Sequence, residues 1–245
     1  MKRVVAPVVS LVAAAALVGL GFGAATVGAT TTSEYASYTA GATTGSVSFV
    51  GNFPSATFTS QRTVGGPFSS AVLSATTPFG AVFGSSSGYT YIAPSSPSIS
   101  GTSATVFTFA SATPATGFGF TLGDIDAESV TISATTTGGV PVTAAELGYQ
   151  SSFNYAGGAD VPTWNAGTSS LIGNTADTSG ASGWFSPTVP LETLTFASTT
   201  LSLSGSPQYQ VWMAALITVP DPTTTSTTTS TTIASTEPVA PAFTG

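Results

Sequence analysis

The stretch "GFGFTLGDIDAESVTIS", from Gly117 to Ser133, places three acidic residues between two apolar runs. In the first run large apolar residues alternate with small ones, which is the period of a β-strand with one buried face. An uninterrupted strand would carry Asp124, Asp126 and Glu128 into the core with the apolar row. Because burial of unpaired carboxylates is costly, we expect the strand to end near Gly123. The acids are then expected outside the core, in a connection between two strands.

The rest of the chain after Ala29 shows the same kind of pattern. Short apolar runs rich in Thr, Ser, Val and Phe are separated by Gly, Pro and Ser clusters, and none of them has helical spacing. This predicts an all-β fold with about ten strands. Their spacing suits a two-sheet β-sandwich of jelly-roll type. The candidate strands begin near residues 46, 56, 71, 88, 104, 117, 128, 140, 192 and 208.

The last apolar run, "QYQVWMAALITV", is apolar on both of its sides. One row holds Val211, Met213, Ala215 and Ile217, and the other holds Trp212, Ala214 and Leu216. A strand that is apolar on both faces is covered on both faces. We therefore expect this strand in the centre of a sheet and Trp212 in the core.

Charge and residue counts exclude several functions. Only 5% of the 245 residues are charged, and the basic residues are Lys2, Arg3 and Arg62. Such a chain has no basic patch for a phosphate backbone, which excludes nucleic acid as a partner. The sequence has no His and no Cys, so Ser-His-Asp and Cys-His catalysis, His or thiolate metal sites and disulfides are excluded by counting.

The two ends of the chain differ from its centre. Residues 1–29 carry two basic residues, an apolar run and then Val27-Gly28-Ala29, which predicts a secretory signal helix cleaved after Ala29. An uncleaved membrane anchor is the alternative, since the run from Val4 to Ala25 is long enough to span a bilayer. Residues 30–218 are the predicted β-sandwich domain. Residues 219–245 are rich in Thr, Ser and Pro, which predicts a disordered stalk, either O-glycosylated or an unmodified spacer.

The acidic connection has two interpretations. Asp side chains commonly accept hydrogen bonds from backbone amides and so shape a tight turn. Alternatively, Asp124, Asp126 and Glu128 join backbone carbonyls around Ca²⁺, which binds oxygen ligands and needs neither His nor Cys. The spacing of the acids is not that of an EF-hand loop.

A paired-carboxylate glycosidase is a further alternative. Its candidate acids are Asp124, Asp126, Glu146, Asp160, Asp177 and Glu192. Polysaccharide-active enzymes surround such acids with sugar-stacking aromatics and with basic or amide groups, which are sparse in this sequence. We therefore expect a protein that is not an enzyme.

Two tryptophans are candidates for ligand binding. Trp164 and Trp184 lie in a region rich in Gly, Ser and Asn, from Phe153 to Ser186, that is typical of a hairpin with long loops. Sugar rings stack on exposed Trp faces. In the competing interpretation, both rings cover the ends of the sandwich core.

Three segments together resemble a family. "FTLGDIDAESVTISA", "GWFSPTVPLETLTF" and "SGSPQYQVWMAALI" are similar to a jelly-roll domain of bacterial exported surface proteins, especially those of actinobacteria. The resemblance covers Val47 to Thr218. It implies a surface display or adhesion module with a galactose-binding-like sandwich. Its partners would be extracellular glycans or host or cell-surface proteins.

The terminal "PAFTG", Pro241 to Gly245, is similar to a sortase sorting signal of the Leu-Ala-any-Thr-Gly type, with Pro241 in place of the Leu. A Thr-rich stalk before such a motif is the arrangement that lifts a domain through a cell wall. We therefore expect a non-catalytic protein that is secreted or displayed on the cell wall and binds a glycan or another ligand through loops of the sandwich. A structural coat or spacer protein is the alternative, and a polysaccharide hydrolase is a third.

Overall fold

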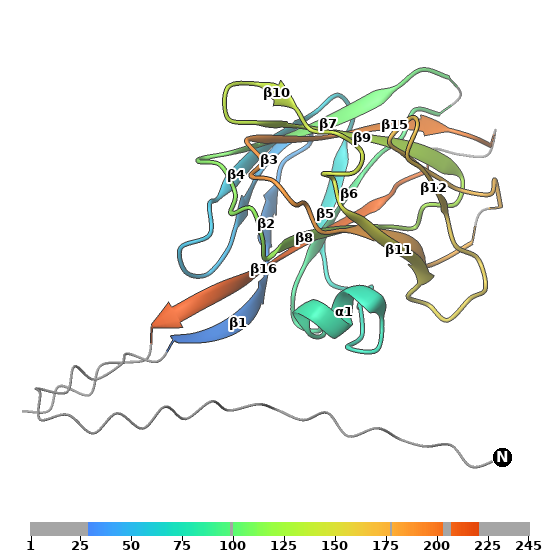
Figure 1. The fold of residues 1–245 in the computed structure, drawn as a ribbon. Coiled ribbons are helices and arrows are strands. Elements are labelled where there is room, and N and C mark those ends of the chain that lie inside the picture. The colour runs from blue at the N-terminus through green and yellow to red at the C-terminus, as the bar shows by residue number, and fades with distance from the viewer. Residues whose placement is uncertain (1–28, 99, 177, 203–206, 221–245) are drawn as a thin grey trace, which may run out of the picture. The chain divides into compact units, whose positions relative to one another are not determined.

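The described chain consists of residues 29–98, 100–176, 178–202 and 207–220, and it is mostly β-strand (Figure 1). The structure is a computed structural model. Residues Ala29–Pro220 form one compact unit. Residues 1–28 of the predicted signal helix, residues 221–245 of the predicted stalk and the sorting motif lie outside the described residues. The predicted bounds are wrong by one residue at Ala29 and by two at Val219 and Pro220, because these residues belong to two paired strands. Within those residues, no helix has the length and apolarity needed to cross a bilayer.

The strands form two antiparallel sheets, which confirms the predicted all-β class. Sheet A has the order β11-β14-β8-β16-β6-β5, and β1 also pairs with β16. Its strands are β1 (Ala29–Tyr35), β5 (Val64–Phe68), β6 (Tyr91–Pro94), β8 (Phe118–Gly123), β11 (Tyr149–Asn154), β14 (Ala181–Phe185) and β16 (Gln210–Pro220).

Sheet B has the order β12-β13-β9-β15-β7-β4-β3-β2, and β10 also pairs with β9. Its strands are β2 (Ser37–Ala40), β3 (Thr44–Ser48), β4 (Ala56–Ser60), β7 (Ser103–Phe109), β9 (Glu128–Thr136), β10 (Val140–Pro141), β12 (Thr163–Asn165), β13 (Ser170–Ile172) and β15 (Thr193–Thr200). The chain passes from sheet A to sheet B at Ala36, between β1 and β2.

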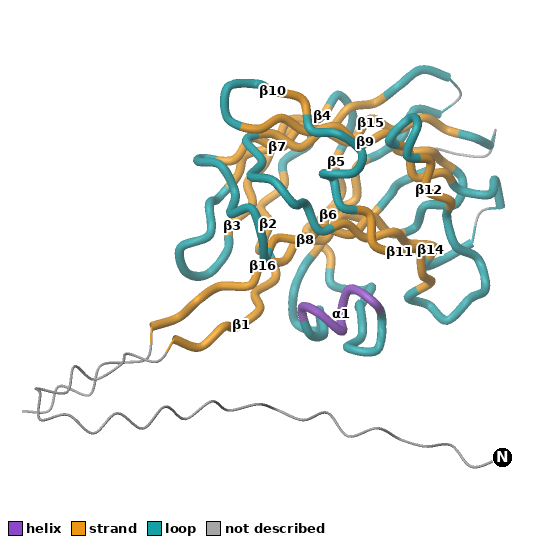
Figure 2. The backbone as a smooth tube through the Cα atoms, in the orientation of Figure 1, coloured by secondary structure: helices purple, strands orange, loops and turns teal. Residues whose placement is uncertain are grey.

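Two of the predicted strands are wrong. The run near residue 71 is a loop that leads into the short helix α1 (Pro78–Phe83), drawn in purple in Figure 2. Thr77 caps this helix, because its hydroxyl accepts a hydrogen bond from the N–H of Gly80, and Pro78 suits the first turn. The run near residue 140 forms only the two-residue strand β10 and then a turn.

The main core lies between the two sheets. Its largest side chains are aromatic, such as Phe107 and Phe196 on sheet B and Phe120 and Phe185 on sheet A. The Phe120 and Phe185 rings stack with centroids 4.9 Å apart and an interplanar angle of 11°. Full burial of such side chains stabilises each by about 1.5 to 3 kcal/mol relative to exposure.

A second core covers the other face of sheet A. Phe79 and Phe83 of α1 pack there against Trp184, in a cluster that also contains Trp212. The aromatic rings approach the sheet closely because β8 has Gly119 at the contact: an added Cβ there would lie 2.6 Å from the Phe83 ring. Every residue of β8 and β14 is consequently buried.

The prediction for the last apolar run is confirmed. β16 lies between β8 on one side and β6 and β1 on the other. Val211, Met213, Ala215 and Ile217 face the core between the sheets, whereas Trp212 and Ala214 face the second core. Trp212 is fully buried.

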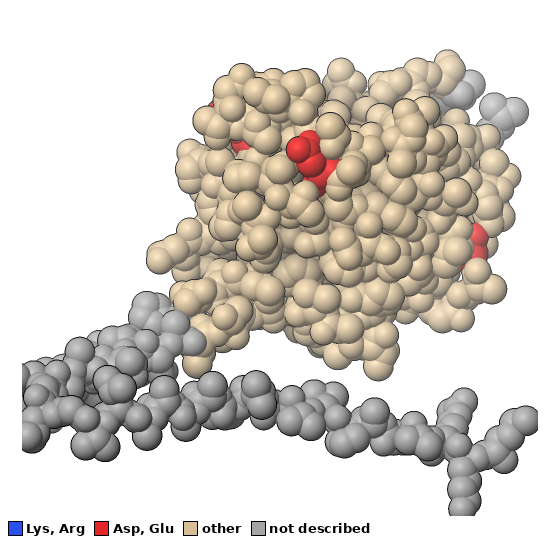
Figure 3. Space-filling model, viewed as in Figure 1, with Lys and Arg blue, Asp and Glu red and all other residues tan. Residues whose placement is uncertain are grey.

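The outer face of sheet B carries hydroxyl groups in place of charges. Thr57, Thr59, Thr131 and Ser133 are exposed on it. Neighbouring hydroxyls pair across strands, as in the 2.8 Å contacts of Thr135 with Thr193 and of Thr131 with Ser170. Such cross-strand hydroxyl pairs contribute to sheet stability. The view in Figure 3 shows a surface with a few acidic groups among predominantly uncharged residues.

Candidate functional site

The acidic turn follows β8, which ends at Gly123 as predicted. Asp124 has a φ of 60°, in the left-handed region that Asp tolerates better than most residues. This reversal breaks the alternation, so that Ile125 enters the core between the sheets. The expectation that the acids lie outside the core is nevertheless wrong for two of them. Asp126 is only 3% exposed and Glu128 is fully buried.

Asp126 is buried because backbone N–H groups satisfy its carboxylate. Oδ1 accepts from the N–H of Ala127 at 2.5 Å, and Oδ2 accepts from the N–H of Thr178 at 2.9 Å. The main-chain oxygen of Asp126 also accepts from the N–H of Thr175 at 2.9 Å. Hydrogen bonds of this kind replace hydration and offset the cost of burial. Asp126 therefore ties the acidic turn to the loop that precedes β14.

Asp124 holds the same loop at its far end. Its Oδ1 accepts a hydrogen bond from the N–H of Gly180 at 3.2 Å, while the N–H of Ile125 donates to the carbonyl of Ala181 at 2.8 Å. Tyr155 lies close to this point, and its hydroxyl donates to Gln210 at 2.9 Å. Burial raises the pKa of Tyr155, and the negative charge of Asp124 raises it further. The phenol therefore stays protonated and available as a donor.

A second layer of polar groups supports the loop from outside. Thr178 donates its hydroxyl to Asp160 at 2.6 Å, and the amide of Asn174 donates to the same carboxylate at 2.5 Å. Asn154 accepts from the N–H groups of Ala156 and Gly158 and donates to the carbonyls of Asp160 and Ser179. We did not predict the roles of Asn154 and Thr178. The "NYAGG" stretch is a turn signal that could have indicated the former.

Glu128 lies at the first position of β9, on the inward row that continues with Val130 and Ile132. In the register of β9 with β15 it is opposite Thr200. Burial raises the pKa of the Tyr209 hydroxyl, and the charge of Glu128 contributes to this rise. Glu128 is therefore an interior residue, and its main-chain oxygen accepts from the N–H of Gly173 at 3.0 Å.

The described acidic residues that were candidates for the metal site and for the catalytic pair make hydrogen bonds within the protein. Across the described residues, no three acidic side chains are grouped so as to hold a metal ion. Asp126 and Asp160 both lie near the hydroxyl of Thr178. The oxygen of this hydroxyl is 2.6 Å from the Asp160 carboxylate and 3.4 Å from that of Asp126. Glu146 instead caps its own turn through the N–H and hydroxyl of Thr143. Glu192 directly precedes β15 and makes backbone hydrogen bonds to Thr135 and Phe109. Asp177 lies outside the described residues.

The two candidate tryptophans both pack against the protein. Trp184 is 7% exposed, donates its ring N–H to Ser151 at 3.1 Å and meets Phe79 edge to face. Trp164 is half-buried and stacks on Tyr149 with centroids 5.4 Å apart. Trp184 therefore covers the core, as the alternative to ligand binding predicted. Trp164 keeps part of its ring exposed.

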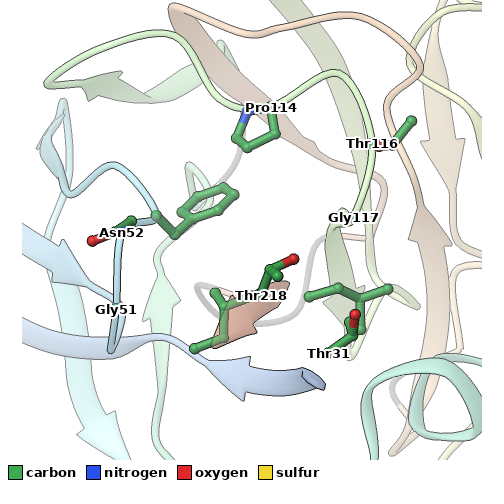
Figure 4. A pocket seen from close by; sticks show the side chains of 10 residues that line it. Thr31, Gly51, Asn52, Pro114, Thr116, Gly117 and Thr218 are labelled. Carbon is green, nitrogen blue, oxygen red and sulfur yellow. The ribbon is translucent and has the colours of Figure 1, made fainter. Parts of the chain in front are cut away.

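A hollow that the sequence did not predict lies between two loops and the β1 and β16 strands (Figure 4). It has a volume of about 740 Å³. Phe53, Leu216 and Ile217 supply apolar surface, and Phe53 continues into the core through stacking on Phe118 at 5.3 Å. We call it the apolar hollow; its remaining lining residues are Thr31, Gly51, Asn52, Pro114, Thr116, Gly117 and Thr218.

The walls of the apolar hollow are held together by main-chain contacts. The N–H of Leu216 donates to the carbonyl of Gly117 at 2.6 Å, which joins β16 to the loop before β8. In Figure 4 Gly51 and Asn52 lie across the hollow from Thr116 and Gly117. A lining of both polar and apolar groups suits a ligand that has both kinds of surface.

Comparison of the chain with family models, with curated proteins and with solved structures found no match. The fold and the sites define the class: an all-β protein of two antiparallel sheets, with a hydrogen-bonded acidic turn at one loop and an apolar hollow between others.

Proposed function

We propose that the protein is an exported, non-catalytic surface protein that binds an extracellular glycan in the apolar hollow. The observation that carries the proposal is the hollow itself: its lining combines the apolar side chains of Phe53, Leu216 and Ile217 with three threonines and Asn52. A sugar has the matching surface, since its C–H faces are apolar and its rim carries hydroxyls. A binding role rather than catalysis is supported by the absence of His and Cys from the sequence.

The jelly-roll topology belongs to this proposal. Eight strands, β6, β7, β8, β9, β13, β14, β15 and β16, can be numbered 1 to 8 along the chain. The run β14-β8-β16-β6 then reads 6-3-8-1, and the run β13-β9-β15-β7 reads 5-4-7-2. This is the order of two interlocked Greek keys, and lectin domains are among the proteins that use it. The topology agrees with a glycan ligand, although the site and not the fold carries the function.

The export part of the proposal rests on residues 1–29. Expression in a bacterial host with a secretory pathway should yield a mature chain that begins at Thr30, as measured by intact-mass spectrometry of the exported protein. Retention of Met1 in the mature chain would contradict cleavage and support the uncleaved anchor. Wall anchoring at the "PAFTG" motif is part of the same proposal, and sortase treatment of the chain tests it directly.

The binding part is tested with the full chain on a glycan array. Leu216 is 37% exposed and lines the hollow, so Leu216→Ala and Asn52→Ala should weaken any glycan that binds there. Val140→Ala is the matched control, because Val140 is 59% exposed and does not line the hollow. Absence of glycan binding, or binding that neither hollow variant alters, would reject the proposal.

A structural coat or spacer is the second candidate function, favoured by the uncharged hydroxyl face of sheet B. Hydroxyls both donate and accept, so such a face stays hydrated without attracting charged partners. Deletion of the gene should then thin or disrupt the surface layer seen by electron microscopy of whole cells. An unchanged surface layer would reject this second candidate function.

A further inference from the structure

A second hollow, with a polar lining, lies around the segment from Gln61 to Thr63. It has a volume of about 630 Å³, and we call it the polar hollow. Its lining consists of one guanidinium group, one amide and five hydroxyl groups, from Thr43, Gln61, Arg62, Thr63, Ser95, Ser96 and Thr102. Neither the acidic turn nor the apolar hollow shares a residue with it.

Arg62 is the only basic residue in the described part of the chain. Its side chain is exposed, its backbone N–H donates to Ser60, and no carboxylate of the described residues forms an ion pair with its guanidinium. Seven acidic residues lie in the described part of the chain. The guanidinium is thus left for an external anion, which it can hold by two parallel hydrogen bonds when the anion is a carboxylate.

The walls of the polar hollow are held in place before any ligand binds. The N–H of Gln61 donates to the carbonyl of Ala104 at 2.9 Å, and the N–H of Ala104 donates back to Oε1 of Gln61 at 3.0 Å. The N–H of Ser95 donates to the carbonyl of Thr63 at 3.0 Å. These bonds fix the Gln61 side chain with its Nε2 group as a remaining donor. A preorganised site of this kind loses little entropy on binding.

Ser96 supplies an independent observation. Its side chain is fully buried at the polar hollow, and its Oγ has no hydrogen-bond partner among the described residues. Buried hydroxyl groups in folded proteins are nearly always hydrogen-bonded, and an exception indicates a partner that the protein does not supply. Ser96 thus has a hydroxyl that could pair with an external polar group, or with a water that such a group orders, at this site.

We propose that the polar hollow binds the carboxylate and hydroxyl groups of a hexuronate residue in an acidic polysaccharide. The planar guanidinium of Arg62 matches the planar carboxylate of one hexuronate residue, which can accept two parallel hydrogen bonds from it. The five hydroxyls and the amide match the ring hydroxyls of a sugar, which both donate and accept hydrogen bonds. This site is separate from the apolar hollow and extends the proposed function to a second, acidic class of glycan.

The test is calorimetric titration of the full chain with trigalacturonate, with neutral galactotriose and sodium acetate as comparison ligands. We expect saturable binding of trigalacturonate. Arg62→Gln should weaken it by about tenfold to a hundredfold, since it removes charge-assisted hydrogen bonds. Arg62→Lys should give an intermediate affinity, because a lysine keeps the charge and loses the two-pronged geometry.

Ser96→Ala separates a ligand partner from a purely structural hydroxyl. It should weaken trigalacturonate binding and leave the melting temperature of the free protein unchanged, because it removes a group that has no partner. Loss of melting temperature with unaltered affinity would overturn this assignment. Leu216→Ala should leave the affinity for trigalacturonate unchanged, because Leu216 does not line the polar hollow. The proposal for the apolar hollow and the proposal for the polar hollow can therefore be rejected separately.

Three outcomes would reject the proposal as a whole. The first is absence of saturable trigalacturonate binding at millimolar concentrations. The second is binding that Arg62→Gln does not alter. The third is equal affinity for acetate or galactotriose, which would show that the sugar ring or the charge is not recognised.

Discussion

The carboxylate of Asp126 accepts a hydrogen bond from the backbone N–H of Thr178, 52 residues further along the chain, at 2.9 Å. This contact joins the turn between β8 and β9 to the loop before β14, and so connects the two sheets at one end of the sandwich. Because Asp126 is buried, the contact is shielded from water and from salt. The acidic turn is therefore a structural joint between distant segments.

Replacement of Asp126 should destabilise the protein. In Asp126→Ala the N–H groups of Ala127 and Thr178 lose their acceptors, so we expect a loss of about 3 kcal/mol in the free energy of unfolding. Asp126→Asn keeps one acceptor and should cost less. Urea denaturation followed by fluorescence measures both. Asp160→Asn is the control, since its contacts are exposed and a loss of about 1 kcal/mol or less is expected.

Calcium should leave the stability unchanged if the acidic turn acts through these hydrogen bonds. Both carboxylate oxygens of Asp126 already accept from N–H groups, which satisfy the buried carboxylate without a cation. The measurement is the melting temperature with millimolar Ca²⁺ and with a chelator. A rise with Ca²⁺ that Asp124→Asn abolishes would instead establish the metal site predicted as the alternative, because a bound ion stabilises the folded state by mass action.

Gly180 should be intolerant of a side chain for two reasons that a control can separate. Its φ is 92°, and an added Cβ would lie 2.6 Å from Oδ1 of Asn154. Gly157 has a similar φ of 83° with nothing within 4 Å, so Gly157→Ala measures the backbone strain alone, about 1 kcal/mol. We expect Gly180→Ala to cost about 3 kcal/mol in thermal or urea unfolding, because the clash adds to the strain. Equal costs for the two variants would contradict the close packing of this loop.

Glu146 should make the stability depend on pH in acid. Hydrogen bonds from the backbone N–H and the hydroxyl of Thr143 lower the pKa of Glu146. A carboxyl group whose pKa is lower in the folded state stabilises the protein above its unfolded pKa, and this contribution is lost as the pH falls through the folded value. The free energy of unfolding of Glu146→Gln should therefore lie below that of the original protein near neutral pH and approach it in strong acid. A difference that stays constant with pH would contradict the role of the carboxylate.

Several parts of this molecule follow from local sequence patterns. Alternation of apolar and small residues predicted β7, β8 and β9, and the doubly apolar run predicted that β16 is central and that Trp212 is buried. The strands are where these patterns place them, because the period of two is a property of the strand itself and survives in any sheet. The expectation of a single buried face is wrong for β8, since every one of its residues is buried. The pattern failed near residue 71, where Thr77 and Pro78 start a helix whose apolar side covers sheet A.

The sequence by itself determined the all-β class, the strand break at Gly123 and the exclusion of His and Cys chemistry, since each depends on residue types or on neighbours along the chain. Only the tertiary structure decided that Asp126 is buried, that Arg62 meets Ser96 at one hollow, and that Phe53 meets Leu216 at another. The reason is physical: the cost of burying a carboxylate depends on which N–H groups reach it. One of those groups, the N–H of Thr178, comes from a loop 52 residues away, whose position local periodicity does not specify.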